Sequence, residues 1–167
     1  MYFLQACQKN RSVPFFQLTN DTVCSIVRHM KERIIMDTNI LFAGIYSSCG
    51  ASFQILRLID NGDIVPVIST PLLFEYEDVL KREQTGLKLS HKQVETILDN
   101  ICALSEFQQT YFLWRPYLKD PNDDHILEVA VASKTKTIVT HNLKDFKRID
   151  KFGVIAISPG KFLEVIR

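Results

Sequence analysis

Carboxylate side chains occur in four separate segments of this chain. Asp37 directly follows the apolar run 34–36, and Glu75 lies within a later segment. The third segment is the acidic run 120–124, and Asp145 lies in the fourth. Carboxylates brought close together repel one another, and a hard divalent cation such as Mg²⁺ relieves that repulsion. Such an ion promotes ionisation of water and stabilises charge on a phosphoryl oxygen. The four segments therefore predict phosphodiester hydrolysis.

These carboxylates can act together only if strands and helices bring their segments to one place. Short apolar runs typical of buried parallel strands lie at 34–36, 64–68, 137–140 and 154–157, and a further strand is predicted at 110–113. Helical patterns are predicted at 51–59, 70–82, 91–104 and 120–131, with a final helix after Ser158. The alternation predicts an α/β fold with a mainly parallel sheet covered by helices. Sites in such sheets form beyond the carboxyl ends of the strands, where the acidic segments fall.

The acidic residues also have simpler structural explanations. Asp120 before Pro121 suits a helix N-cap, and Asp123 then falls in the first turn, where the helix dipole favours negative charge. Glu75 and Glu77 lie on opposite borders of the apolar face of their predicted helix, so periodicity alone does not choose between them. Glu75 is nearer the start of the helix, which Thr70 is predicted to cap, and hence nearer the strand ends.

The bulk properties narrow the class of protein. A length of 167 residues with 46% hydrophobic residues favours one domain with an ordinary core. A net charge of +1 gives no general attraction to nucleic acid. The four cysteines form no zinc-binding pattern, and no apolar run is long enough to span a bilayer. We therefore expect a soluble cytoplasmic protein, with residues 1–32 as an extension of the domain formed by residues 33–167.

Four ordered motifs resemble those of PIN domains. Residues 34–41 resemble the opening strand with its Asp-Thr-Asn motif, and residues 72–80 are similar to the second acidic segment, with the acid at Glu75. Residues 120–127 resemble the third segment, where the usual family spacing back from Thr140 selects Asp124. Residues 139–146 resemble the fourth. The similarity is strongest to VapC-like toxins of bacterial toxin–antitoxin pairs, and it covers about residues 33–160.

The resemblance implies a PIN-like three-layer sandwich and a Mg²⁺- or Mn²⁺-dependent ribonuclease, a hydrolase that acts as the toxin of a type II toxin–antitoxin pair. It implies a homodimer, an RNA substrate and inhibition by a small antitoxin protein. Metal ligands would be Asp37, Glu75 and Asp124, and Asn142 or Asp145 would complete the pocket. Many PIN domains carry Asp where this chain has Asn142, so the second metal position stays open.

Several polar and basic residues could contact substrate. They are Thr38, Asn39, Thr140, Lys144, Lys147 and Arg148. Phosphate contacts of this kind supply position and salt-dependent affinity. Because Asp145 and Asp150 are interleaved with the basic residues after position 143, a plain solvated face is the better explanation of that segment. Trp114 and Tyr117 could stack on bases.

Three other functions share parts of this pattern. A phosphatase with an aspartate nucleophile usually needs a second Asp where this chain has Asn39, and a flap-type nuclease needs more acids and larger insertions. The non-enzyme alternative is a PIN-like RNA- or protein-binding module with a weakened metal site, which Asn142 favours.

Overall fold

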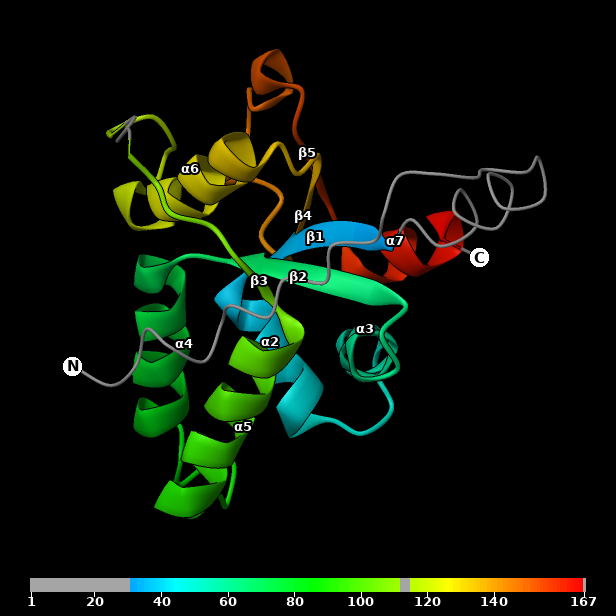
Figure 1. Ribbon diagram of the computed structural model, residues 1–167, viewed down its shortest axis with the longest axis vertical. Helices are drawn as coiled ribbons and strands as arrows, with labels where there is room; N and C mark the ends of the chain where they lie inside the picture. Colours follow the sequence, from blue (N-terminus) through cyan, green and yellow to red (C-terminus); the bar gives the residue numbers. More distant parts are fainter. Residues whose placement is uncertain (1–30, 112–114, 167) are drawn as a thin grey trace, which may run out of the picture.

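A five-stranded parallel sheet lies at the centre of this computed structural model, which describes residues 31–111 and 115–166 (Figure 1). The strands are β1 (Glu32–Met36), β2 (Ile64–Ile68), β3 (Glu106–Phe107), β4 (Thr137–Val139) and β5 (Ile155–Ile157). Their order is β3-β2-β1-β4-β5, and each neighbouring pair is parallel. The prediction of an α/β fold with a mainly parallel sheet is confirmed.

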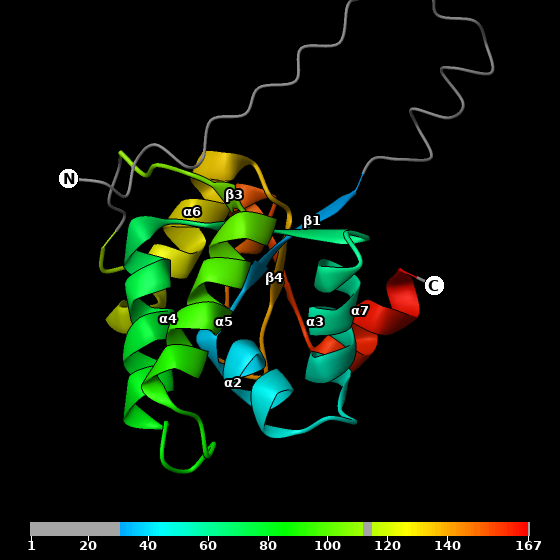
Figure 2. The ribbon, with the colours of Figure 1, turned by 60° about the horizontal axis from the view of Figure 1, so that its bottom comes forward.

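Helices cover both faces of the sheet. They are α2 (Thr38–Tyr46), α3 (Ala51–Asp60), α4 (Thr70–Arg82), α5 (His91–Leu104), α6 (Asp124–Ser133) and α7 (Pro159–Val165), with 3₁₀ turns η1 (Pro121–Asp123) and η2 (Asp150–Phe152). Figures 1 and 2 show α2 to α5 on one side of the sheet and α6 on the other. Helix α7 packs against α3. The result is a three-layer sandwich. None of the described helices has the length and apolarity that crossing a bilayer requires.

The middle of the sheet is fully buried. Ile35 of β1 pairs in register with Ile138 of β4, and neither side chain is exposed to solvent. Strand β1 has neighbours on both edges, so residues 34–36 are buried between the two helical layers. This burial explains why the strand is apolar at consecutive positions instead of alternating. It also fixes where the strand ends, and therefore where Asp37 lies.

Helices α2 and α3 approach closely at Gly44. A Cβ atom built on Gly44 would lie 2.5 Å from Cδ1 and 2.9 Å from Cγ of Leu56, and 3.1 Å from the carbonyl oxygen of Ser52. These distances are shorter than van der Waals contact, so the helix pair packs at its present separation only because residue 44 has no side chain.

Most predicted elements are present, with several differences. The helix predicted to open at Asp120 is instead the 3₁₀ turn η1 followed by α6, which begins at Asp124. Helix α2 was not predicted. The strand predicted at 110–113 is instead the two-residue β3 beside β2, and the described residues 110 and 111 belong to no strand. Helix α4 begins at Thr70 with Ser69 as its N-cap, so Thr70 is the first helical residue and not the cap. The predicted extension, apart from residues 31 and 32, lies outside the described residues.

Candidate active site

Asp37 lies at the carboxyl edge of the sheet, directly after β1. Its backbone N–H donates to the carbonyl of Val139 at the end of β4, with an N···O distance of 3.0 Å. Asp37 is also the N-cap of α2, and its side chain accepts from the N–H of Asn39. Only 6% of Asp37 is exposed. The parallel pairing of β1 with β4 therefore brings the first and fourth acidic segments together, as the sequence predicts.

Two donors occupy one oxygen of the Asp37 carboxylate. The Thr140 hydroxyl donates to Oδ2 at 2.5 Å, and the Asn39 amide donates to the same oxygen at 2.7 Å. Oδ1 accepts only a long contact of 3.5 Å from the Asn39 N–H. Oδ2 thus fixes the orientation of the carboxylate, and Oδ1 is the oxygen that is left for a cation.

Helix α4 brings Glu75 to the same edge. The next residue, Tyr76, is fully buried and its hydroxyl donates to the carbonyl of Met36, which ties α4 to the end of β1. Glu75 Oε2 lies 2.7 Å from His125 Nε2. Glu77 points elsewhere and forms an exposed ion pair with Lys81. Of the two glutamates that periodicity left open, the structure places Glu75 at the sheet edge.

The consecutive residues Asp123 and Asp124 have different surroundings. Asp124 is 1% exposed, and its carboxylate accepts hydrogen bonds from the backbone N–H groups of Tyr117 and Leu118 at 2.7 to 3.2 Å. Asp123 is half-buried and experiences the negative charges of Asp37 and other acids of the edge. Asp124 therefore anchors a loop, whereas Asp123 belongs electrostatically to the acidic group.

The charges of this group shift pKa values upward. Burial raises the pKa of Asp123 to about 7, with further increases from the negative charges of Asp37, Asp120, Glu75 and Asp145. Burial also raises the pKa of Asp37; the Thr140 and Asn39 hydrogen bonds partly offset that rise, and the charge of Glu75 adds to it. Burial is the larger cause of both shifts, and the neighbouring acids add to it, so ionising Asp37 and Asp123 together is unfavourable without a cation.

The fourth segment contributes Asp145 and Asn142. Asp145 is half-buried and close enough to raise the pKa of Asp123. Asn142 is exposed, and its backbone N–H donates to the Thr140 hydroxyl at 2.8 Å. Asn142 therefore supports Thr140 through its main chain.

The donor set fits a hard divalent cation. The group offers carboxylate oxygens, among them Asp37 Oδ1, which accepts only one long hydrogen bond, and such ligands suit Mg²⁺ or Mn²⁺ better than a soft metal. Among the described residues, no three His, Cys, Asp or Glu side chains lie close enough together to coordinate one ion as they stand. Full coordination would thus need side-chain adjustment, water or substrate oxygens, as is usual for Mg²⁺.

The predicted substrate contacts divide into two sets. Thr38 and Thr140 are buried, and Thr140 is committed to Asp37. Lys144, Lys147 and Arg148 are exposed. Trp114 lies outside the described residues.

Tyr117 connects the anchored loop to the basic segment. Its hydroxyl donates to the carbonyl of Arg148 at 2.8 Å, and Lys151 Nζ lies 4.3 Å from its ring centroid. Tyr117 is therefore packed against the basic segment and is not a free stacking platform.

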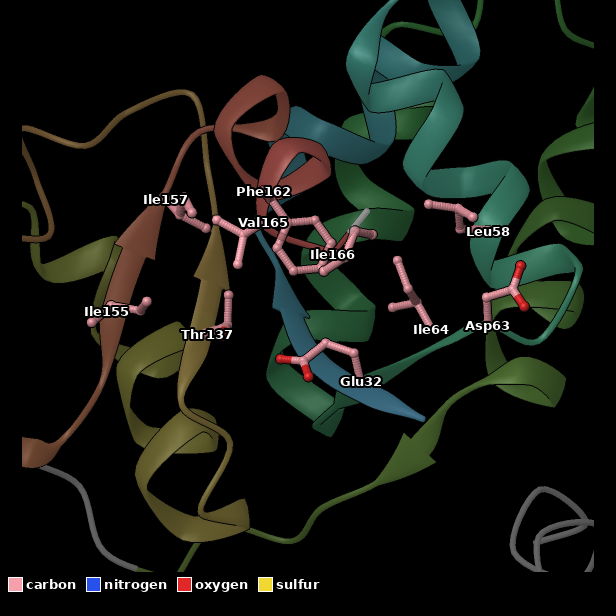
Figure 3. Close-up of a pocket in the computed structure, with 10 residues that line it drawn as sticks. All are labelled: Glu32, Leu58, Asp63, Ile64, Thr137, Ile155, Ile157, Phe162, Val165 and Ile166. Carbon is pink, nitrogen blue, oxygen red and sulfur yellow. The ribbon is translucent and has the colours of Figure 1, made fainter. Parts of the chain in front are cut away.

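A pocket of about 530 Å³ lies at the opposite edge of the sheet (Figure 3). Its lining includes the first residues of β1, β2 and β4, namely Glu32, Ile64 and Thr137, together with Phe162 and Val165 of α7. None of the acidic residues described above lines it. Because the carboxylates gather at the carboxyl edge, we place the candidate chemistry there and not in this pocket.

Asp123 and His125 are the members of this site that the sequence motifs did not select. Consecutive helical residues point about 100° apart, so choosing between Asp123 and Asp124 requires the orientation of α6 relative to the sheet. No sequence pattern supplies that orientation, and none pairs His125 with Glu75.

Comparisons with known proteins agree with this geometry. The PIN domain family profile matches residues 33–144. VapBC2 from Rickettsia felis, solved bound to a DNA fragment from its promoter, contains a chain of similar fold, with a TM-score of 0.54 and 21% identity. That match covers 75% of this chain and 98% of the other. No curated protein matches the sequence. Because the profile match covers most of the chain and includes β1, α4, α6 and β4, this chain belongs to the PIN-domain family, whose members are generally nucleases.

Proposed function

We propose that this protein is a Mg²⁺- or Mn²⁺-dependent endoribonuclease that hydrolyses phosphodiester bonds of single-stranded RNA. The observation that carries the proposal is the unbalanced negative charge at the carboxyl edge of a PIN-domain sheet, where burial and neighbouring acids raise the pKa of Asp123 to about 7. Charge of this kind stabilises a divalent cation and has no evident structural use in a metal-free domain.

Asp37, Glu75 and Asp123 would hold the ion, with Asp145 at the border of the group. A bound Mg²⁺ or Mn²⁺ supplies positive charge that promotes ionisation of water and stabilises the scissile phosphate. Thr140 and Asn39 orient Asp37 through Oδ2. Preorganised side chains of this kind reduce the reorganisation required when substrate binds.

Asp123 takes the place that family spacing gives to Asp124. The Asp124 carboxylate already accepts from two backbone amides and is almost completely buried. A metal ion at Asp124 would compete with these hydrogen bonds for the lone pairs of a carboxylate that is only 1% exposed, and any hydrogen bond it displaced would leave a backbone N–H without an acceptor. We therefore assign Asp124 to holding the loop and Asp123 to the ion.

The remaining parts of the proposal concern partners. The similarity in fold to a chain of VapBC2 supports a role as the toxin of a toxin–antitoxin pair, with a small antitoxin as partner. The homodimer as the working form is proposed from the family resemblance alone. We place this activity in the cytoplasm, where RNA is the available substrate.

The test is cleavage of a mixed single-stranded RNA pool by the purified protein. Reactions contain Mn²⁺, Mg²⁺ or EDTA, and the variants are Asp37→Asn, Asp123→Asn and Asp124→Asn. We expect metal-dependent cleavage by the wild type and a loss of 100-fold or more, about 3 kcal/mol, in the first two variants. Asp124→Asn should retain cleavage within about tenfold at temperatures where it is folded.

The outcomes separate the candidate functions. Cleavage that survives Asp37→Asn would indicate a contaminating nuclease. Absence of cleavage, with folded protein that binds RNA but not Mn²⁺, would favour the binding module instead of the enzyme.

A further inference from the structure

His125 is a buried histidine that contacts an acidic residue of the candidate site. It is the second residue of α6, its side chain is 10% exposed, and its Nε2 atom lies 2.7 Å from Glu75 Oε2. Glu75 comes from α4, which lies on the other side of the sheet (Figure 1). The pair therefore connects the two helical layers at the sheet edge where the acids gather.

His125 Nε2 and Glu75 Oε2 are each other's nearest polar contact. Both are buried, and neither makes a hydrogen bond to any other group in the described part of the chain. A glutamate side chain has several rotatable bonds, and fixing them costs as much as about 1.5 to 2 kcal/mol. Without His125, Glu75 would have no other described side chain to select one rotamer.

The helix backbone that carries the imidazole is held in place on both sides. The neighbouring Asp124 carboxylate is bonded to the backbone of Tyr117 and Leu118, and Ile126 on the other side is fully buried. The start of α6 is thus fixed on both sides of His125. The contact with His125 can therefore restrict the flexible Glu75 side chain to one position.

We propose that His125 is a positioning residue for Glu75: its Nε2 atom holds Oε2 and leaves Oε1 available to the divalent cation. The inference rests on the proposed metal-dependent function. Partners that orient a ligand in this way typically change metal affinity by about 10- to 100-fold when they are removed.

The experiment measures the Kd for Mn²⁺ by titration calorimetry on the full chain. The variants are His125→Leu, which removes the nitrogen but keeps bulk, and His125→Gln, which keeps an amide nitrogen at similar reach. We expect His125→Leu to weaken Mn²⁺ binding about 10-fold or more, and His125→Gln to restore most of the affinity. His125→Asn, whose amide is too short to reach Glu75, replaces the leucine variant if that variant does not fold.

His91→Leu is the matched control. His91 forms an exposed pair with Glu95 within α5, with an Nε2···Oε1 distance of 3.9 Å, and lies outside the acidic group. We expect no change in Mn²⁺ affinity. An equal loss in this control would overturn the inference.

A double-mutant cycle tests whether His125 acts through Glu75. In the Glu75→Gln background, His125→Leu should cause little further loss, because the residue to be positioned has lost its charge. An undiminished loss in that background, or unchanged or tighter binding by His125→Leu alone, would overturn the proposal. A wild-type protein that binds no Mn²⁺ would overturn the proposed function and this inference with it, whereas wild-type binding that His125→Leu leaves unchanged would overturn this inference alone.

Discussion

Asp123 and Asp124 show how differently two neighbouring carboxylates can be used. Asp124 gains hydrogen bonds from two backbone amides, which tie down the loop at Tyr117 and Leu118. Asp123 gains no side-chain cap hydrogen bond and lies among like charges. One residue is therefore expected to stabilise the metal-free fold, and the other to destabilise it.

Asparagine at position 124 should destabilise the protein, whereas asparagine at position 123 should not. Asp124→Asn should lower the free energy of unfolding by about 1 to 3 kcal/mol, because an NH₂ group would replace one carboxylate oxygen, and the remaining amide oxygen is a neutral and therefore weaker acceptor. Asp123→Asn should leave stability unchanged or raise it, because it removes repulsion. Urea unfolding in EDTA at pH 7 measures both. A larger loss of unfolding free energy in Asp123→Asn than in Asp124→Asn would contradict the assignment of Asp124 to the loop and Asp123 to the ion.

The pH dependence of stability should depend on Asp123. Its pKa is about 7 in the folded protein and about 4 in an unfolded chain, so the folded state binds this proton more tightly. The resulting stabilisation is fully present below about pH 4 and is lost as pH rises through 7. We expect the difference in Tm between Asp123→Asn and the wild type, both in EDTA, to grow in favour of the variant over this window. A constant difference would contradict the raised pKa.

At the scale of helices and strands, sequence patterns were reliable where burial is one-sided or complete. Strand β2 and helix α5, with its Ser90 capping box, lie where their patterns predict. Helix α2 was missed because residues 40–43 form a continuous apolar run, which does not distinguish a buried helix from a strand. Strand β3 has two exposed residues and exists only by pairing with β2, so no local pattern marks it.

The sequence predicted the location of the candidate site but not the direction of its side chains. The rule that sites form at the carboxyl ends of parallel strands correctly located Asp37 beside Thr140. The direction in which each acidic side chain points depends on helix orientation, which spacing alone does not determine. For this reason the roles of Asp123 and His125 emerged only from the three-dimensional structure.

The contact between α2 and α3 gives a prediction for Gly44. Gly44→Val should lower the free energy of unfolding by about 1 to 3 kcal/mol, because the new side chain would overlap Leu56 and the Ser52 carbonyl. Gly160→Ala in α7 is the control, because its added Cβ has no atom within 4 Å. Thermal unfolding measures both variants. A Gly44→Val protein as stable as the wild type would mean that α2 and α3 can move apart without a loss of stability.

At the scale of the whole molecule, a net charge of +1 means that RNA affinity must come from local positive charge. Lys144 and Lys147 are exposed and adjoin Asp145 of the candidate site. We combine Lys144→Ala and Lys147→Ala in a protein that Asp37→Asn has made inactive. The slope of log association constant for RNA against log salt concentration should become shallower by about 1 to 1.5, because each lost phosphate contact contributes about 0.7. Fluorescence anisotropy with labelled single-stranded RNA measures this slope.

A second double variant with the same change in net charge is the control. Lys92→Ala and Lys161→Ala remove exposed charges from α5 and α7. Their slope should match that of the parent protein. Equal slopes in both double variants would show that the segment after β4 does not contact the RNA.

The loop anchored by Asp124 links two regions of the molecule. Asp124 holds the backbone at Tyr117, and the Tyr117 hydroxyl holds the carbonyl of Arg148 in the basic segment. Under the proposed function, substitutions at position 123 would lower turnover, and substitutions at position 124 would lower the amount of folded protein. In a mutational library scored separately for cellular abundance and for activity per molecule, substitutions at 124 would deplete the first score, and those at 123 only the second.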